Sequence, residues 1–330
     1  MRFFIDIKHY GLLVGFATLL IMTLTNCGQP SNPKVARIKW VFPKSQNELL
    51  VWHEDNSINT LELQDGQFRT KEDYISVDRQ PGTLVFQSKA NLYYFGTNGL
   101  YVLNMVDMKE HFLFVPPSDF LADANEKYIV FLKSLRSILI YSGAMEYGLI
   151  CNPIVPEGEF IHDAVLLDSY LIAVSAISDV PADELAKKGL VLDFYEMRNN
   201  EDMTLVKSVR VNGNRLSWVV SGGDKLIALI DGEISVYNTQ GAIMFKRAII
   251  DSGNALGRST LPEKHDSNNI VFGIIEVSPM GEANNYIIHI TQANDIYDIR
   301  KIEISGNLWG LVYIGGKYVW INAQGNLVIY

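Results

Sequence analysis

The sequence predicts an all-β fold, a seven-bladed β-propeller, and three observations predict it. A hairpin pattern, in which an apolar strand, a short polar turn and a second strand follow each other, occurs seven times. The hairpins recur about every 45 residues, which is the length of one four-stranded propeller blade. Glycine occupies the turns, as in Asp231-Gly232 and Gln324-Gly325, whereas helical periodicity is confined to residues 181–188.

Each hairpin is expected to supply the second and third strands of one blade, with an inner strand before it and an outer strand after it. The seventh hairpin ends at Tyr330, so the last blade either has three strands or is completed by residues just after Lys34. The seven hairpins, in order, are Leu49–Gln64, Leu92–Asn104, Tyr128–Ser142, Tyr170–Glu196, Leu226–Asn238, Ile270–Thr291 and Tyr318–Tyr330.

The start of the chain has the features of an export signal. Arg2 and Lys8 precede an uncharged apolar run from Gly11 to Leu24, and Cys27 follows shortly after it. At about 1.5 Å per residue, this run is too short to cross a hydrocarbon core of about 30 Å, and it suits the apolar region of a signal peptide. An uncleaved membrane anchor and a plain signal peptide with an incidental cysteine remain alternatives.

A cysteine directly after such a run resembles the lipobox of bacterial lipoproteins. The resemblance implies a signal peptide at 1–26, a lipidated Cys27 with a tether at 27–35, and the propeller at 36–330. Two or three acyl chains would hold the protein at a membrane. Gly28 resembles the signal for release to the outer membrane, so the expected location is the bacterial cell envelope, at the outer membrane.

Composition restricts the partners and the chemistry. The formal net charge is −9 and no basic cluster occurs, which argues against nucleic acid as a partner. Cys151 ends an apolar run and is expected to be a buried thiol without a disulfide partner. The histidines lack metal-ligand spacing and no nucleophile or phosphate-binding motif is present, so the sequence assigns no metal, cofactor or catalytic residue.

The segments Leu226–Gly241 and Tyr318–Tyr330 carry a family resemblance. Their strand–turn–strand pattern is similar to the repeat unit of quinoprotein-type and YVTN-type propellers, within the broader WD40-like group, although no Trp-Asp pair ends each blade. The resemblance implies a propeller over about 290 residues. In function, the protein looks most like the lipid-anchored propeller subunit of the outer-membrane barrel-assembly machinery.

Three long segments are expected to form loops on one face of the ring: 177–188, 251–269 and 278–285. Long loops on a rigid scaffold commonly carry function. The candidate partner-binding residues in these segments are Asp179, Asp183, Glu184, Arg258, Lys264 and Met280.

The sequence therefore favours a noncatalytic, lipid-anchored scaffold that binds another envelope protein through its loop face. One alternative is a propeller-type hydrolase or lactonase with a site at the mouth of the central channel. Another alternative is a carbohydrate-binding surface protein that stacks sugars on Tyr93, Tyr94 or Trp320, although inter-blade packing is the simpler role for these rings.

Overall fold

Residues Arg37–Tyr330 form one compact unit in a computed structural model of the protein, and the fold is that of this unit. Within the chain, the structure describes residues 36–76, 85–116, 121–125, 127–134, 136–142, 148–151, 159–167, 170–177, 190–198, 202–211, 215–260, 262, 269–293, 296–306 and 308–330. All regular elements in these ranges are β-strands, and they contain no helix that is long and apolar enough to span a membrane.

Six antiparallel sheets of four strands follow each other along the chain, and we call them blades 1 to 6. Blades 1 to 3 contain β1 (Ile38–Pro43), β2 (Glu48–His53), β3 (Ser57–Gln64), β4 (Gln67–Ser76), β5 (Val85–Ser88), β6 (Asn91–Gly96), β7 (Gly99–Asn104), β8 (Lys109–Phe114), β9 (Leu121–Ala124), β10 (Tyr128–Ser134), β11 (Ser137–Ser142) and β12 (Gly148–Cys151). Blades 4 to 6 contain β13 (Glu159–Leu167), β14 (Tyr170–Ile177), β15 (Leu190–Arg198), β16 (Asp202–Val211), β17 (Leu216–Gly222), β18 (Lys225–Ile230), β19 (Glu233–Tyr237), β20 (Ile243–Ala248), β21 (Ala255–Ser259), β22 (Asn269–Val277), β23 (Ala283–Ala293) and β24 (Ile296–Ile304).

A three-stranded sheet, here called the closing sheet, ends the described chain. It contains β25 (Trp309–Ile314), β26 (Lys317–Ile321) and β27 (Leu327–Ile329). The prediction of an all-β propeller is confirmed. The predicted count of seven blades is corrected to six four-stranded blades, and the last hairpin lies in the three-stranded sheet that the sequence left open as one alternative. The physical reason is that β27 has β26 as its only neighbour in the sheet, so the closing sheet lacks an outer strand among the described residues.

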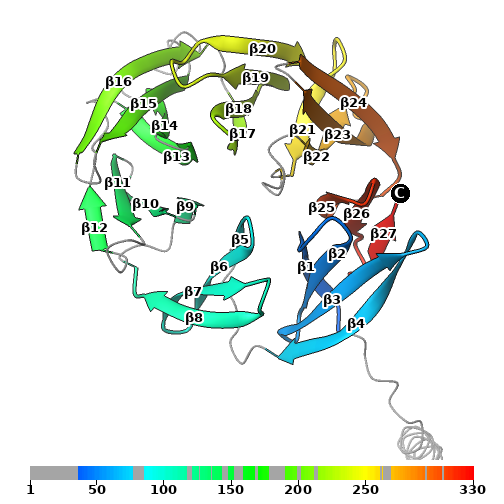
Figure 1. The fold of residues 1–330 in the computed structure, drawn as a ribbon. Coiled ribbons are helices and arrows are strands. Elements are labelled where there is room, and N and C mark those ends of the chain that lie inside the picture. The colour runs from blue at the N-terminus through cyan, green and yellow to red at the C-terminus, as the bar shows by residue number, and fades with distance from the viewer. Residues whose placement is uncertain are drawn as a thin grey trace, which may run out of the picture. The chain divides into compact units, whose positions relative to one another are not determined.

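The sheets are arranged around a common centre, as Figure 1 shows, with β5, β9, β13 and β17 near the middle and β8, β16 and β20 at the rim. Among the described residues, six hydrophobic clusters of the core each lie between two sheets that are neighbours in chain order. The remaining cluster joins the closing sheet to blade 1, where Val319 and Ile321 pack with Val41 and Leu49. Continuous apolar packing between neighbouring sheets therefore closes the ring.

The two ends of the strands define two faces of this unit. The connection face carries the turns between second and third strands and the passages from one sheet to the next. The turn face carries the turns between first and second strands, among them residues 44–47 and Gly315-Gly316. Gly315 and Gly316 have φ angles of +55° and +76°, which is the backbone of a type I′ turn and favours glycine.

The bulky rings considered as a sugar-stacking shelf belong to the core. Tyr93, Tyr94 and Trp320 are 3%, 0% and 5% exposed. Tyr94 packs edge-on against Trp52 of blade 1, at 5.2 Å between ring centroids, in the cluster between blades 1 and 2. The alternative that these three residues bind sugars is therefore wrong, and their role is inter-blade packing.

Candidate functional site

Two of the predicted partner-binding residues are described by the structure, and both belong to blade 6. Arg258 lies in β21, and Met280 lies in the turn between β22 and β23 on the connection face. The other predicted positions, together with the expected helix at 181–188, lie outside the described residues; the site positions among them are Cys27, Asp179, Asp183, Glu184 and Lys264.

Arg258 occupies a strand, not a loop. The expectation of a single loop over 251–269 is wrong because β21 pairs with β22 inside it, with Arg258 opposite Ile275. The Arg258 guanidinium lies over the ring of Trp309, at 4.5 Å from the ring centroid, and Trp309 is 47% exposed. Both side chains line a small cavity of about 90 Å³ between blade 6 and the closing sheet.

Met280 is the most exposed large apolar residue described, with 90% of its surface accessible. It stands in the turn Ser278–Glu282, which is closed by hydrogen bonds between Ser278 and Glu282 and between Gly281 and Ser278. Arg258 and Met280 belong to blade 6 and Trp309 begins β25 of the closing sheet, and we call these three residues the blade-6 surface. It combines an arginine, a methionine and a tryptophan, which are the residue types enriched at protein interfaces.

Arg215 holds this part of the connection face in place. It stands just before β17 of blade 5, and its guanidinium donates to the carbonyl oxygens of Leu256 at 2.9 Å and Gly257 at 3.1 Å. Its own backbone N–H donates to the carboxylate of Asp231 at 3.0 Å. The strand that carries Arg258 is therefore tied to the neighbouring blade by charge-assisted hydrogen bonds.

A buried carboxylate fixes the passage from blade 5 to blade 6. Glu276 is 1% exposed and accepts hydrogen bonds from the backbone of Asp251 at 2.6 Å, the Asn254 amide at 2.9 Å and the Lys301 ammonium at 2.5 Å. Lys301 also contacts the Asp251 carboxylate at 3.1 Å and lies over the ring of Tyr286. These contacts join three segments of blade 6 at the connection face.

The pKa of Glu276 reflects this environment. Burial alone would raise the pKa, but the hydrogen bonds from Lys301, Asn254 and the Asp251 backbone outweigh burial, so the pKa lies below its ordinary value. For Lys301, burial would lower the pKa, and the hydrogen bonds to Glu276 and Asp251 raise it above the ordinary value instead. Both groups are therefore charged at neutral pH.

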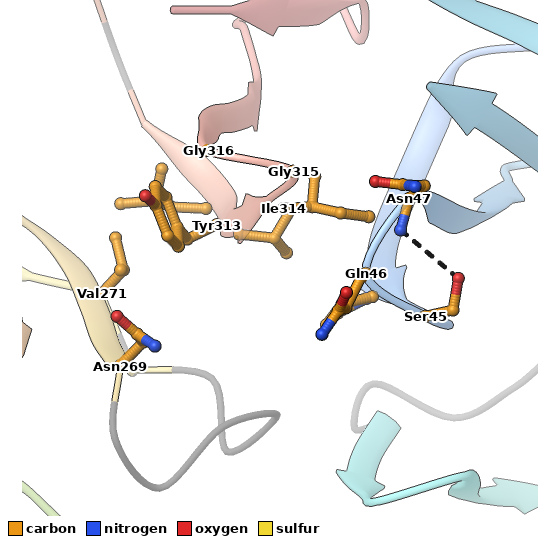
Figure 2. Close-up of a pocket in the computed structure, with 12 residues that line it drawn as sticks. Ser45, Gln46, Asn47, Asn269, Val271, Tyr313, Ile314, Gly315 and Gly316 are labelled. Atoms are coloured by element: carbon orange, nitrogen blue, oxygen red, sulfur yellow. Dashed lines mark hydrogen bonds between the residues drawn. The ribbon is translucent and has the colours of Figure 1, made fainter. Parts of the chain in front are cut away.

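A larger pocket opens on the turn face, where blade 1, blade 6 and the closing sheet meet. Figure 2 shows this turn-face pocket, whose volume is about 320 Å³. Its rim is polar and exposed, and its floor is formed by buried apolar residues such as Val271 and Leu311. The described lining consists of Pro43, Ser45, Gln46, Asn47, Asn269, Val271, Leu311, Val312, Tyr313, Ile314, Gly315 and Gly316.

Blade 2 and the closing sheet both support the blade-1 turn at this pocket. The Gln87 amide, which is buried, donates to the carbonyl oxygen of Pro43 at 2.9 Å. Gly315 lies against the same turn, because a Cβ on it would stand 2.5 Å from Cδ2 of Leu63 and 3.4 Å from Oδ1 of Asn47. The rim therefore consists of the turn at 44–47 and the turn at Gly315-Gly316, which contact each other.

A buried histidine stands directly behind the pocket. His289 is 3% exposed, and its Nδ1 and Nε2 atoms lie 2.8 Å from the Tyr318 hydroxyl and 3.1 Å from Asn269 Oδ1. Its ring also packs on Tyr313, at 4.5 Å between centroids. Asn269 and Tyr313 line the pocket, so the histidine contacts two lining residues without lining the pocket itself.

Among the described residues, no group of three or more His, Cys, Asp or Glu side chains is placed to hold a metal ion. Asp123, a buried acid on the inner strand β9, has a structural role: its two oxygens accept backbone hydrogen bonds from Ala124 at 2.7 Å and from Leu166 of blade 4 at 2.8 Å. It links the inner strands of blades 3 and 4.

Several solved structures are similar to this chain at low identity. BamB from Moraxella catarrhalis is 12% identical, with a TM-score of 0.44, covering 88% of this chain and 82% of that one. The computationally designed Ika8 protein is 11% identical with a TM-score of 0.49, covering 89% and 96%, and the WD40 β-propeller domain of Doa1 is 12% identical with a TM-score of 0.48, covering 89% and 92%. No protein-family model and no curated protein matches the chain. At these identities and TM-scores, the comparisons assign no function to this chain.

Sequence reasoning missed the turn-face pocket. Its lining residues come from three places in the chain, near 45, 270 and 313, and only ring closure brings them together. The Gly315-Gly316 pair was the one local signal at this site, since paired glycines indicate a tight turn. His289 carried no signal, because a single histidine within an apolar strand gives no sign of its partners.

Proposed function

We propose that this protein is an exported, lipid-anchored binding scaffold of the bacterial cell envelope, held at the outer membrane through Cys27. The apolar run Gly11 to Leu24 and the cysteine that follows it support export and acylation. The β-propeller supports a scaffold role, since it presents fixed loops and strand ends on two faces.

The blade-6 surface is the observation that carries the binding role. Trp309 is 47% exposed although it is a large aromatic residue, and Arg258 covers one face of its ring. Met280 is 90% exposed in the β22–β23 turn of blade 6, the blade that also carries Arg258. An arginine stacked on an exposed tryptophan loses little conformational freedom on binding, so it suits a protein partner. We infer that the partner is another envelope protein.

Site-specific photo-crosslinking tests this surface. A benzophenone amino acid at Met280, in the full chain expressed in its host, is expected to give a specific adduct with one envelope protein. The same probe at Val106, which is 74% exposed in the β7–β8 turn on the turn face, serves as the matched control. Trp309→Ala in the Met280 probe background should abolish the adduct, whereas Phe112→Ala, which truncates a 51% exposed ring on β8, should leave it intact.

An equal adduct from both probe positions, or an adduct that survives Trp309→Ala, would contradict binding at the blade-6 surface. Acylation is tested separately with an alkyne analogue of palmitate. The intact chain should incorporate the label and the Cys27→Ala variant should not. Label in both forms, or in neither, would contradict the lipid anchor.

A further inference from the structure

Among the described residues, those that line the turn-face pocket are all uncharged, although 20% of the residues in the chain are charged. Its described polar side chains are those of Ser45, Gln46, Asn47, Asn269 and Tyr313. Amides and hydroxyls offer donors and acceptors at fixed angles, and they bind a ligand without providing a countercharge. A neutral ligand with many hydroxyl groups matches this set, since each hydroxyl both donates and accepts.

Asn269 turns its amide oxygen toward His289 in the structure. A neutral imidazole has one donor and one acceptor, and an amide oxygen can only accept. With the amide in this orientation, a neutral His289 ring carries its proton on Nε2, and Nδ1 accepts from the Tyr318 hydroxyl. Burial raises the pKa of Tyr318, in line with its role as a donor. Figure 2 shows that the nitrogen of the Asn269 amide faces the pocket.

The rest of the pocket provides an apolar floor and a ring at its edge. Val271 and Leu311 are 4% and 3% exposed and form part of the floor. Tyr313 lines the pocket while packing on His289 and Tyr318, which holds its ring in place. A saccharide has hydroxyl groups around its edge and C–H groups on its faces, so it fits a polar rim above an apolar floor. A volume of about 320 Å³ suits a small ligand.

We propose that the turn-face pocket binds a neutral saccharide unit, with Gln46 and Asn269 hydrogen-bonded to its hydroxyl groups. His289 is a positioning residue that holds the Asn269 amide nitrogen toward the ligand. This site is separate from the blade-6 surface and goes beyond the scaffold role, because the two lie on opposite faces of the unit and use different residues.

The test uses the full chain, purified in detergent, on a printed array of neutral and acidic glycans. We expect selective binding to neutral glycans, and the best of these, as a soluble oligosaccharide, is then titrated by calorimetry. Gln46→Ala removes an exposed rim side chain and is expected to weaken binding about tenfold, as for the loss of one or two hydrogen bonds. Gln240→Ala, an exposed amide in the β19–β20 turn on the same face, should leave the affinity unchanged.

His289 is tested by two substitutions. His289→Gln can still accept from Tyr318 and donate to Asn269, so it should retain binding, whereas His289→Phe should lose about tenfold or more. The side-chain amide NMR signals of Asn269 should shift with the oligosaccharide in the intact protein and in His289→Gln, but not in His289→Phe. Equal binding by His289→Gln and His289→Phe would overturn the positioning role.

Three results would overturn the saccharide proposal. One is the absence of binding to any neutral glycan on the array, and another is an affinity that Gln46→Ala does not change. The third is that trialanine amide, tested as a neutral peptide probe, shifts the Asn269 signals while the oligosaccharides do not, which would assign the pocket to a peptide.

Discussion

Truncation of Ile321 in the closing sheet tests whether the ring is closed by packing. Ile321 is 4% exposed and belongs to the cluster that joins the closing sheet to blade 1. Replacing a buried isoleucine by alanine typically costs about 2–5 kcal/mol, and we expect about 3 kcal/mol for Ile321→Ala. At about 2 °C per kcal/mol for a domain of this size, the melting temperature should fall by about 6 °C.

Ile140→Ala is the matched control for this measurement. Ile140 is fully buried in the cluster between blades 3 and 4, far from the point of closure. Urea unfolding followed by far-UV circular dichroism should give similar losses for the two variants, within about 1 kcal/mol, because a closed ring has no terminal sheet. A loss below about 0.5 kcal/mol for Ile321→Ala, with about 3 kcal/mol for Ile140→Ala, would refute closure through this cluster.

Two further predictions concern Glu276 at the connection face and Gly315 at the turn face. The pKa of Glu276 lies below its ordinary value in the folded protein. Its charge therefore stabilises the fold at pH values above the ordinary pKa, and this contribution is lost as the pH falls through the lowered pKa. Glu276→Gln leaves Lys301 without its buried partner and should cost about 3 kcal/mol at pH 7. Because the variant has no carboxyl to protonate here, its stability should fall less steeply below the ordinary glutamate pKa of 4.5 in acid titrations monitored by fluorescence, and an unchanged pH dependence would contradict this. Gly315→Ala should cost about 1 kcal/mol more than Gly316→Ala in thermal melts, because both have positive φ but only the former would press on Leu63; equal costs would contradict the close approach.

The paired second and third strands could be predicted because they carry strong local signals. The hairpin at 226–238 is an example: β18 is apolar from Leu226 onward, β19 alternates, and Asp231-Gly232 adopts the positive φ angles of a two-residue turn. The short inner strands β9 and β21 could not be predicted in this way. β9 has the sequence Leu-Ala-Asp-Ala and β21 has a single large apolar residue, so their pairing depends on the neighbouring long strands.

The candidate sites were less accessible to sequence reasoning than the fold. Arg258 was expected in a loop and lies in β21, and its partner Trp309 lies about 50 residues further along the chain and meets it only across two sheets. The turn-face pocket depends on contacts between the first and the last sheets. Local propensity contains no information on such contacts, because they follow from the number of sheets that fit around the ring.

Hydrogen–deuterium exchange of β1 and β25 tests ring closure most directly. The N–H of Ile38 donates to the carbonyl oxygen of Gly325 at 3.1 Å, and β1 packs on the closing sheet. In a closed ring, peptides covering β1 and β25 should exchange as slowly as those covering β17 in blade 5. Exchange of β1 and β25 that is faster by orders of magnitude, with β17 still protected, would show frayed end sheets and contradict both the closed propeller and the pocket built at its closure.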